Sequence, residues 1–143
     1  MNEMKTSAVD EVRLDDAAAL KAVALDYLEG WFEGDVARME RALHPELVKR
    51  SFDPVPDGGD LVTLTAEQMI GWTSDAVGRT RDVPDRAIRI VFEHVHGDIA
   101  TLVVESAVYI EFIHLVRTSV GWKIVNILWE WASEEAKARA QAQ

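Results

Sequence analysis

Four short runs rich in valine, isoleucine, phenylalanine, tyrosine and tryptophan follow one another in the second half of the chain. They cover residues 86–95, 99–105, 108–118 and 122–131, and only a few residues separate each run from the next. Side chains of these types favour β-strands. Because parallel strands need a crossover connection of a dozen or more residues, we expect the four runs to form an antiparallel meander.

The first half of the chain shows a helical period instead. An apolar stripe at helical spacing lies between Asp15 and Gly34. Its members are Leu20, Val23, Ala24, Tyr27, Leu28 and Trp31. Gly34 is suited to end this helix, and Asp35 is suited to cap a second, short helix over Val36–Leu43.

The segment between the two helices and the meander contains shorter signals. Leu47–Phe52 and Leu61–Leu64 read as brief strands on either side of a loop dense in turn-forming residues. Thr65, with Gln68 three residues later, predicts a capping box that opens a helix reaching about Val77. Helices followed by a long, curved antiparallel sheet indicate an α+β fold.

Length and composition limit the function classes. The 143 residues suit one domain, which we place at 15–131, with a polar lead-in at 1–14 and a polar tail at 132–143. A net charge of −10 disfavours nucleic acid and anionic membranes as partners. The chain has no cysteine, no apolar run long enough to span a membrane and no secretory signal, so we expect a cytoplasmic protein.

Both faces of the last two predicted strands are apolar. Along 108–118, alternate residues include Phe112 and His114 on one face and Ile113 and Leu115 on the other. One face must pack on the helices, and no helices remain to cover the other. We therefore predict a homodimer through an outer sheet face. The residues assigned to that face are Ile113, Leu115, Trp122, Ile124 and Leu128.

Three segments of the chain resemble a known superfamily. They are YLEGWFEGDVARMERALHPEL (Tyr27–Leu47), GGDLVTLTAEQM (Gly58–Met69) and EFIHLVRTSVGWKIVNILWEW (Glu111–Trp131). They are similar to segments of the nuclear-transport-factor-2-like superfamily, a cone-shaped, cystatin-like α+β fold shared with ketosteroid isomerase and polyketide-cyclase-like proteins. Within it, the resemblance is greatest to the "Putative lumazine-binding" group.

The resemblance implies an apolar pocket open at one end of the cone. Ketosteroid isomerase places there a carboxylate base, a tyrosine and a protonated aspartate. By motif register, the tyrosine matches Tyr27 and the aspartate matches His114. The base falls on or near Ser51, and neither Arg50, Ser51 nor Phe52 is a carboxylate. This departure argues against steroid-type isomerisation.

Five tryptophans suggest an aromatic wall for a small apolar or aromatic ligand, although core packing explains large aromatic side chains equally well. The residues expected to line the pocket are Trp31, Ser51, Trp72, Phe112, Ile127, Trp129 and Trp131. His94 and His96 form a His-x-His pair that lacks a third metal ligand, so we expect neither a metal nor another cofactor.

Three functions fit these observations. The first is a dimeric protein that binds a small molecule in an aromatic pocket. The second is a cofactor-free isomerase, cyclase or dehydratase in which His114 transfers protons and Tyr27 donates a hydrogen bond. The third is a dimerisation or interaction module without a ligand. The sequence has no nucleophile elbow, phosphate-binding glycine loop or zinc-protease motif that would indicate another enzyme class.

Overall fold

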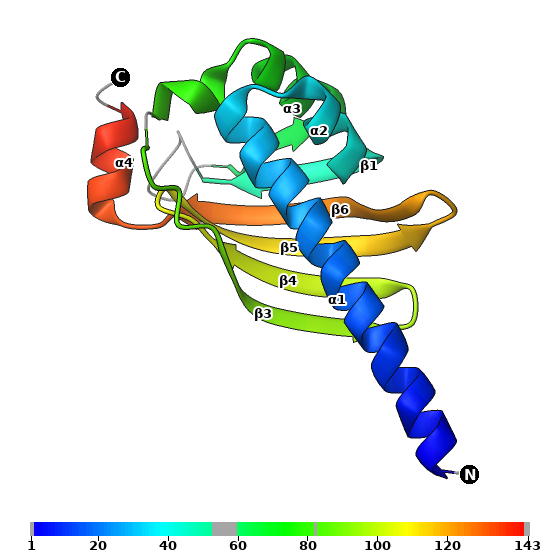
Figure 1. Cartoon of the computed structure of the whole chain (residues 1–143). Coiled ribbons are helices and arrows are strands. Elements are labelled where there is room, and N and C mark those ends of the chain that lie inside the picture. The colour runs from blue at the N-terminus through cyan, green and yellow to red at the C-terminus, as the bar shows by residue number, and fades with distance from the viewer. Residues whose placement is uncertain (1, 53–59, 82, 142–143) are drawn as a thin grey trace.

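The computed structural model describes residues 2–52, 60–81 and 83–141. Three α-helices, a 3₁₀ helix and two strands precede the meander, and a short α-helix follows it (Figure 1). The elements in chain order are α1 (Asn2–Glu33), α2 (Val36–Ala42), β1 (Leu43–Ser51), β2 (Val62–Thr65), α3 (Ala66–Ser74), the 3₁₀ helix η1 (Val77–Arg81), β3 (Arg89–His96), β4 (Ile99–Glu105), β5 (Tyr109–Thr118), β6 (Gly121–Trp131) and α4 (Glu134–Gln141).

The six strands form one sheet in the order β2-β1-β6-β5-β4-β3. Strands β3 to β6 pair antiparallel with their neighbours in sequence, which confirms the predicted meander. Strand β1 pairs with β6 in parallel, and β2 extends the sheet antiparallel to β1. The fold is therefore α+β, as the sequence predicts.

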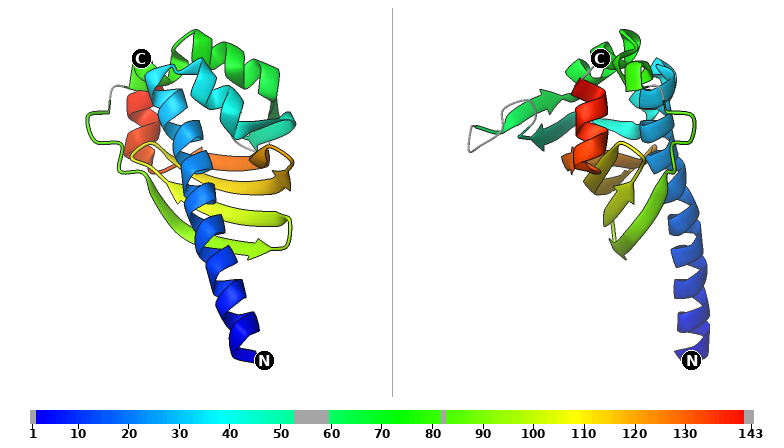
Figure 2. Two further views of the ribbon diagram at one scale, coloured as in Figure 1. Left: turned by 45° about the vertical axis from the view of Figure 1, so that its right-hand side comes forward. Right: turned by 90° about the vertical axis from the view of Figure 1, so that its left-hand side faces the viewer.

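Helix α1 crosses one face of the curved sheet, and α4 lies at the end of the sheet (Figure 2). We name the face towards α1 the inner face and the opposite one the outer face. Leu20 and Leu28 of α1 are buried in one core with Ile113 and Ile124 of the inner face. We use "cone" for the space enclosed by the inner face, α1 and η1.

Local sequence signals explain where the helices begin and end. Gly34 adopts a positive φ of 70°, which lets α1 stop, and the Asp35 side chain accepts a hydrogen bond from the Arg38 backbone to cap α2. Thr65 and Gln68 form the predicted capping box at α3. Helix α1 begins at Asn2, well before the apolar stripe that predicted a start near Asp15.

A β-bulge in β6 changes which residues face the cone. The pairing with β5 shifts between His114–Asn126 and Leu115–Ile124, so Val125 is an extra residue. Strict alternation is interrupted there. The inner-face residues therefore have even numbers before the bulge and odd numbers after it. They are Trp122, Ile124, Ile127, Trp129 and Trp131.

No helix among the described residues is long and apolar enough to cross a membrane.

Candidate functional site

Three ionisable side chains meet inside the cone, each from a different element. The Tyr27 hydroxyl donates a hydrogen bond to Glu111 Oε2 over 2.6 Å and accepts one from Lys49 Nζ over 2.5 Å. Lys49 Nζ also lies 3.7 Å from Glu111 Oε2. The exposed fractions of Glu111, Tyr27 and Lys49 are 1%, 1% and 8%. We name these three residues the buried triad.

Periodicity brings the triad together. Tyr27 belongs to the apolar stripe of α1, which faces the sheet. Glu111 alternates with the buried residues Tyr109 and Ile113 on the inner face of β5. Lys49 alternates with buried neighbours on β1 in the same way. Because β1 and β5 both pair with β6, their inner-face side chains reach the same part of the cone.

An aromatic shell surrounds the triad. Lys49 Nζ lies 5.2 Å from the ring centroid of Tyr27, 5.7 Å from that of Trp31 and 5.4 Å from that of Trp129. Trp129 and Trp131 pack edge to face with centroids 5.0 Å apart, and both contact the ring of Tyr109. Cations over aromatic faces are stabilised by the ring quadrupole, so this shell helps to hold the buried ammonium.

A second polar centre lies beside the triad. The Tyr109 hydroxyl accepts hydrogen bonds from Trp31 Nε1 over 2.9 Å and from Arg81 Nε over 3.0 Å. The Arg81 guanidinium also lies over the Trp131 ring. Trp129, Trp131 and Arg81 are only partly buried, so this end of the cone is the more open one.

Burial perturbs three of these groups. Desolvation raises the pKa of Tyr27 well above its usual value, and the neighbouring Glu111 carboxylate raises it further. Desolvation lowers the pKa of Lys49, against the opposing effect of Glu111. Burial also raises the pKa of Tyr109, although Arg81 opposes the shift. Such perturbation is typical of functional sites, although structural ion pairs also cause it.

The triad can donate, accept and relay protons. Glu111 offers acceptor oxygens, Lys49 offers N–H donors, and the Tyr27 hydroxyl connects the two. In surroundings shielded from water, these groups can orient a polar ligand or move a proton along a short path.

Most of the residues predicted to line the pocket lie towards the cone. Tyr27, Trp31 and Ile127 are buried there, and Trp129 and Trp131 are partly buried. Of the three candidates at the end of β1, Ser51 is buried two residues beyond Lys49 on the same side of the strand, whereas Arg50 and Phe52 are exposed.

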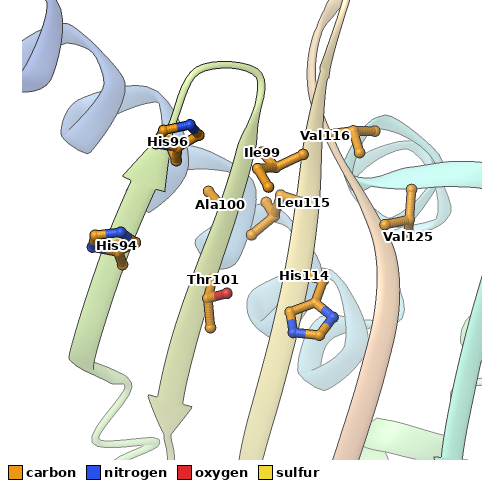
Figure 3. Close-up of a pocket in the computed structure, with 9 residues that line it drawn as sticks. All are labelled: His94, His96, Ile99, Ala100, Thr101, His114, Leu115, Val116 and Val125. Carbon is orange, nitrogen blue, oxygen red and sulfur yellow. The ribbon is translucent and has the colours of Figure 1, made fainter.

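Three predicted residues lie elsewhere. His114 is exposed on the outer face, so it does not face Tyr27 across the cone. Figure 3 shows His114 beside Thr101 and His94 on neighbouring strands. These three residues line a hollow of about 290 Å³. Phe112 lies on the same outer face, and Trp72 is exposed on α3. The predicted alternation along β5 is confirmed, but the face that packs against the helices is the one that carries Ile113 and Leu115.

The same reversal corrects the predicted dimer face. Ile113, Leu115, Trp122 and Ile124 are all buried in the core, and only Leu128 of that set lies on the outer face. Trp122 donates a hydrogen bond to the Asp16 carboxylate of α1 over 3.4 Å, which ties the far end of the sheet to the helix.

The sequence prediction missed Lys49, Glu111, Tyr109 and Arg81. A signal for Glu111 was present, because it is a lone carboxylate among apolar residues on one face of a strand. A buried carboxylate needs a partner, so this pattern indicates a site residue. Lys49 and Arg81 carried no comparable signal, since lysines and arginines are common at exposed strand and helix positions.

The described part of the chain brings no three histidine, aspartate or glutamate side chains together as a metal site. His94 and His96 are both exposed on β3.

Comparison with solved structures identifies the class of fold. An NTF-2 like protein of unknown function from Silicibacter pomeroyi is 22% identical with a TM-score of 0.70, over 83% of this chain and 98% of that one. An NTF2-like protein with a cystatin-like fold from Novosphingobium aromaticivorans is 17% identical with a TM-score of 0.67, over 97% of both chains. The chain therefore has the nuclear-transport-factor-2-like fold.

The family follows from the sequence match. Residues 15–130 match the family described as "Putative lumazine-binding", and the chain belongs to that family. A search of curated proteins finds no relative that matches. The family match confirms the resemblance seen in the three sequence segments.

Proposed function

We propose that this chain is a small-molecule-binding protein that holds a flat, conjugated ligand in the cone, next to the buried triad. The observation that carries the proposal is the enclosure of Tyr27, Lys49 and Glu111 by aromatic rings. Burying ionisable groups costs free energy that an apolar core would avoid, so their presence supports a binding role. Membership of the family described as "Putative lumazine-binding" supports it as well.

The chemistry of the site matches a ligand with both hydrogen-bond donors and acceptors. Lys49 can donate to a carbonyl oxygen, and Glu111 can accept from a ring N–H. Lumazine, a flat bicyclic molecule with ring carbonyl and N–H groups, carries both. Its faces can stack on the indole of Trp129, where burial contributes roughly 25 cal/mol per Å² of apolar area.

Calorimetric titration with lumazine tests this function. Tyr27→Phe and Lys49→Met remove one polar partner each and should weaken binding about ten- to a hundredfold, since a hydrogen bond to a charged group contributes about 1.5–3 kcal/mol. His114→Ala is the matched control, because His114 lies on the outer face and should leave the affinity unchanged. Binding lost only in His114→Ala would place the ligand on the other side of the sheet.

We also propose that the protein is a homodimer through the outer face. An apolar row crosses four strands there, with Phe92 paired to Val103, Val103 to Phe112 and Phe112 to Leu128. Phe92, Phe112 and Leu128 are each more than half exposed. A second copy presenting the same row by two-fold symmetry would cover it with an identical apolar surface.

A catalytic role is the second candidate, and the triad favours it. The carboxylate that the resemblance did not locate near Ser51 is present as Glu111, hydrogen-bonded to Tyr27. An isomerase, cyclase or dehydratase could use this pair to remove a proton from, or add one to, the carbon atom next to a carbonyl group. Deuterium exchange into an enolisable ketone, followed by NMR, should then be faster with the wild type than with Tyr27→Phe. The same rate for both proteins would argue against catalysis by this pair.

The remaining alternative is an interaction module in which the tryptophans only fill the cone. Trp31, Trp129 and Tyr109 contact their neighbours closely enough to serve as core residues. Dimerisation through the outer face together with no thermal shift across a screen of aromatic compounds would favour this module.

A further inference from the structure

Lys49 differs from the other lysines whose side chains the structure describes. Lys21 is exposed on α1, and Lys123 and Lys137 are partly exposed. Lys49 is buried, and among these four it is the one enclosed by aromatic rings. A buried amine on the buried face of a strand requires an explanation beyond solubility or surface charge.

The hydrogen bonding of Lys49 is incomplete for a buried ammonium. An ammonium has three N–H donors. Among the described residues, the Tyr27 hydroxyl lies within hydrogen-bonding distance of Nζ, while Glu111 Oε2 is 3.7 Å away. The rings of Trp31 and Trp129 occupy other directions and offer no strong acceptor. This environment accommodates a neutral amine more readily than a surface does, in agreement with the lowered pKa of Lys49.

We propose that Lys49 is a nucleophilic amine that condenses with the aldehyde or ketone carbonyl of a molecule bound in the cone. This inference rests on the proposed ligand site and adds to it the class of ligand, a conjugated carbonyl compound. Buried lysines with a lone pair available are the groups that form Schiff bases in proteins.

The neighbouring residues can supply the proton movements. Lys49 first releases one proton, which the Glu111 carboxylate can take up directly or through the Tyr27 hydroxyl. The nitrogen lone pair then forms a bond to the carbonyl carbon, and the carbonyl π electrons move to oxygen. That oxygen takes a proton from the Tyr27 hydroxyl, and the protonated Glu111 returns a proton to Tyr27. The attached nitrogen then gives up one of its two protons, and Glu111 and Tyr27 relay it to the same oxygen. The C–O bond breaks, water leaves, and the nitrogen lone pair forms the C=N bond. The products are a protonated imine on Lys49 and one water molecule, so atoms and charge balance.

Charges around the nitrogen favour this course. Glu111 of β5 balances the protonated imine, as it balances the ammonium, and Tyr27 of α1 stays protonated because its pKa is raised. Arg81 of η1 disfavours the charged form of Lys49. Tyr109 of β5 accepts its hydrogen bonds from Trp31 and Arg81 rather than from Lys49.

Reductive trapping tests the proposal on the wild-type protein. The protein is incubated at neutral pH with cinnamaldehyde and sodium cyanoborohydride, and the sites of reductive alkylation are mapped by mass spectrometry. We expect Lys49 to carry at least about ten times the label of Lys21, an exposed lysine, because surface amines are almost fully protonated at this pH. Lys49→Arg should lose that label, whereas Lys21→Arg should retain it.

The outcomes separate this inference from the ligand site. If Lys49 reacts no faster than Lys21 in the wild type, the nucleophile is wrong, whether or not Lys49→Arg folds. If lumazine binds with the expected dependence on Tyr27 while Lys49 stays unlabelled, the amine chemistry fails and the ligand site stands. If Lys49 is labelled preferentially and lumazine does not bind, the nucleophile stands and the proposed ligand is replaced by a carbonyl compound.

Discussion

The substitution Glu111→Gln measures how strongly the buried triad depends on its negative charge. Glutamine keeps an acceptor oxygen for the Tyr27 hydroxyl but removes the charge 3.7 Å from Lys49 Nζ. Removing one partner of a buried ion pair costs about 3–5 kcal/mol, because the other charge is left without compensation.

The chemistry of Lys49 sets an upper limit on this cost. The stranded amine can release its proton, and from its usual pKa of 10.5 that release costs about 4.8 kcal/mol at pH 7 and about 2 kcal/mol at pH 9. We therefore expect Glu111→Gln to lower the free energy of unfolding by about 3–5 kcal/mol at pH 7 and by no more than about 2 kcal/mol at pH 9.

The direction of this pH dependence follows from proton binding. The folded-state pKa of Lys49 lies below its unfolded value, so between the two values the unfolded chain binds more protons and stability rises with pH. Losing Glu111 removes the effect that raises the folded-state pKa of Lys49. It therefore widens the pH range over which stability rises. Below both values the charge penalty is present in full.

Urea unfolding followed by far-UV circular dichroism at both pH values measures the effect. Glu105→Gln is the matched control on the adjacent strand, because Glu105 pairs with Arg89 at the surface, where ion pairs contribute little. A loss of stability in Glu111→Gln that is the same at pH 7 and pH 9 would refute the reasoning.

Three further predictions concern the dimer face, helix packing and alkaline pH. Phe112→Glu places a charge in the outer apolar row and should give monomers by light scattering, and an unchanged dimer would contradict the proposed interface. Gly78→Ala would place a Cβ 2.2 Å from the carbonyl oxygen of Trp31 and should lower the free energy of unfolding by about 1–3 kcal/mol. Gly71→Ala on α3 meets nothing within 4 Å and should raise it by about 0.5–1 kcal/mol. Equal effects of the two variants in thermal unfolding would count against this packing. Because the pKa of Tyr27 is raised above its usual 10.0, the unfolded chain loses the Tyr27 proton first, and stability falls as pH rises past 10. Tyr27→Phe should reduce that fall in stability, measured by urea unfolding at each pH. An identical fall in both proteins would argue against a buried hydroxyl.

The sequence was sufficient to predict the fold because its signals were local. Four closely spaced apolar runs allow little besides a meander, and the pair Thr65 and Gln68 identified the start of α3. The apolar stripe of α1 correctly placed Tyr27 and Trp31 in the interior.

The site was only half predictable because both faces of β5 are apolar. Alternation shows which residues share a face, but it does not show which face meets the helices. The sequence prediction therefore places His114 and Phe112 in the cone, whereas the structure has Glu111 and Ile113 there. On β6 the extra residue Val125 reverses the alternation of the side chains. A strict alternation along the whole strand therefore assigns the wrong face to the residues on one side of the bulge.

Lys49 could not be predicted from a local pattern at all. Its burial depends on the parallel pairing of β1 with β6, which joins segments that are distant in sequence. Its partners Tyr27 and Glu111 come from two other elements. Sites of this kind arise from tertiary contacts, and they become visible only once the strand order is known.

A crystal structure of the protein grown with lumazine tests the ligand site most directly. The account predicts density for the bicyclic ring inside the cone, against the indole of Trp129 and with a carbonyl oxygen within hydrogen-bonding distance of Lys49 Nζ. Density in the outer-face hollow beside His114, or an empty cone at saturating lumazine in a protein that binds it in solution, would contradict the account.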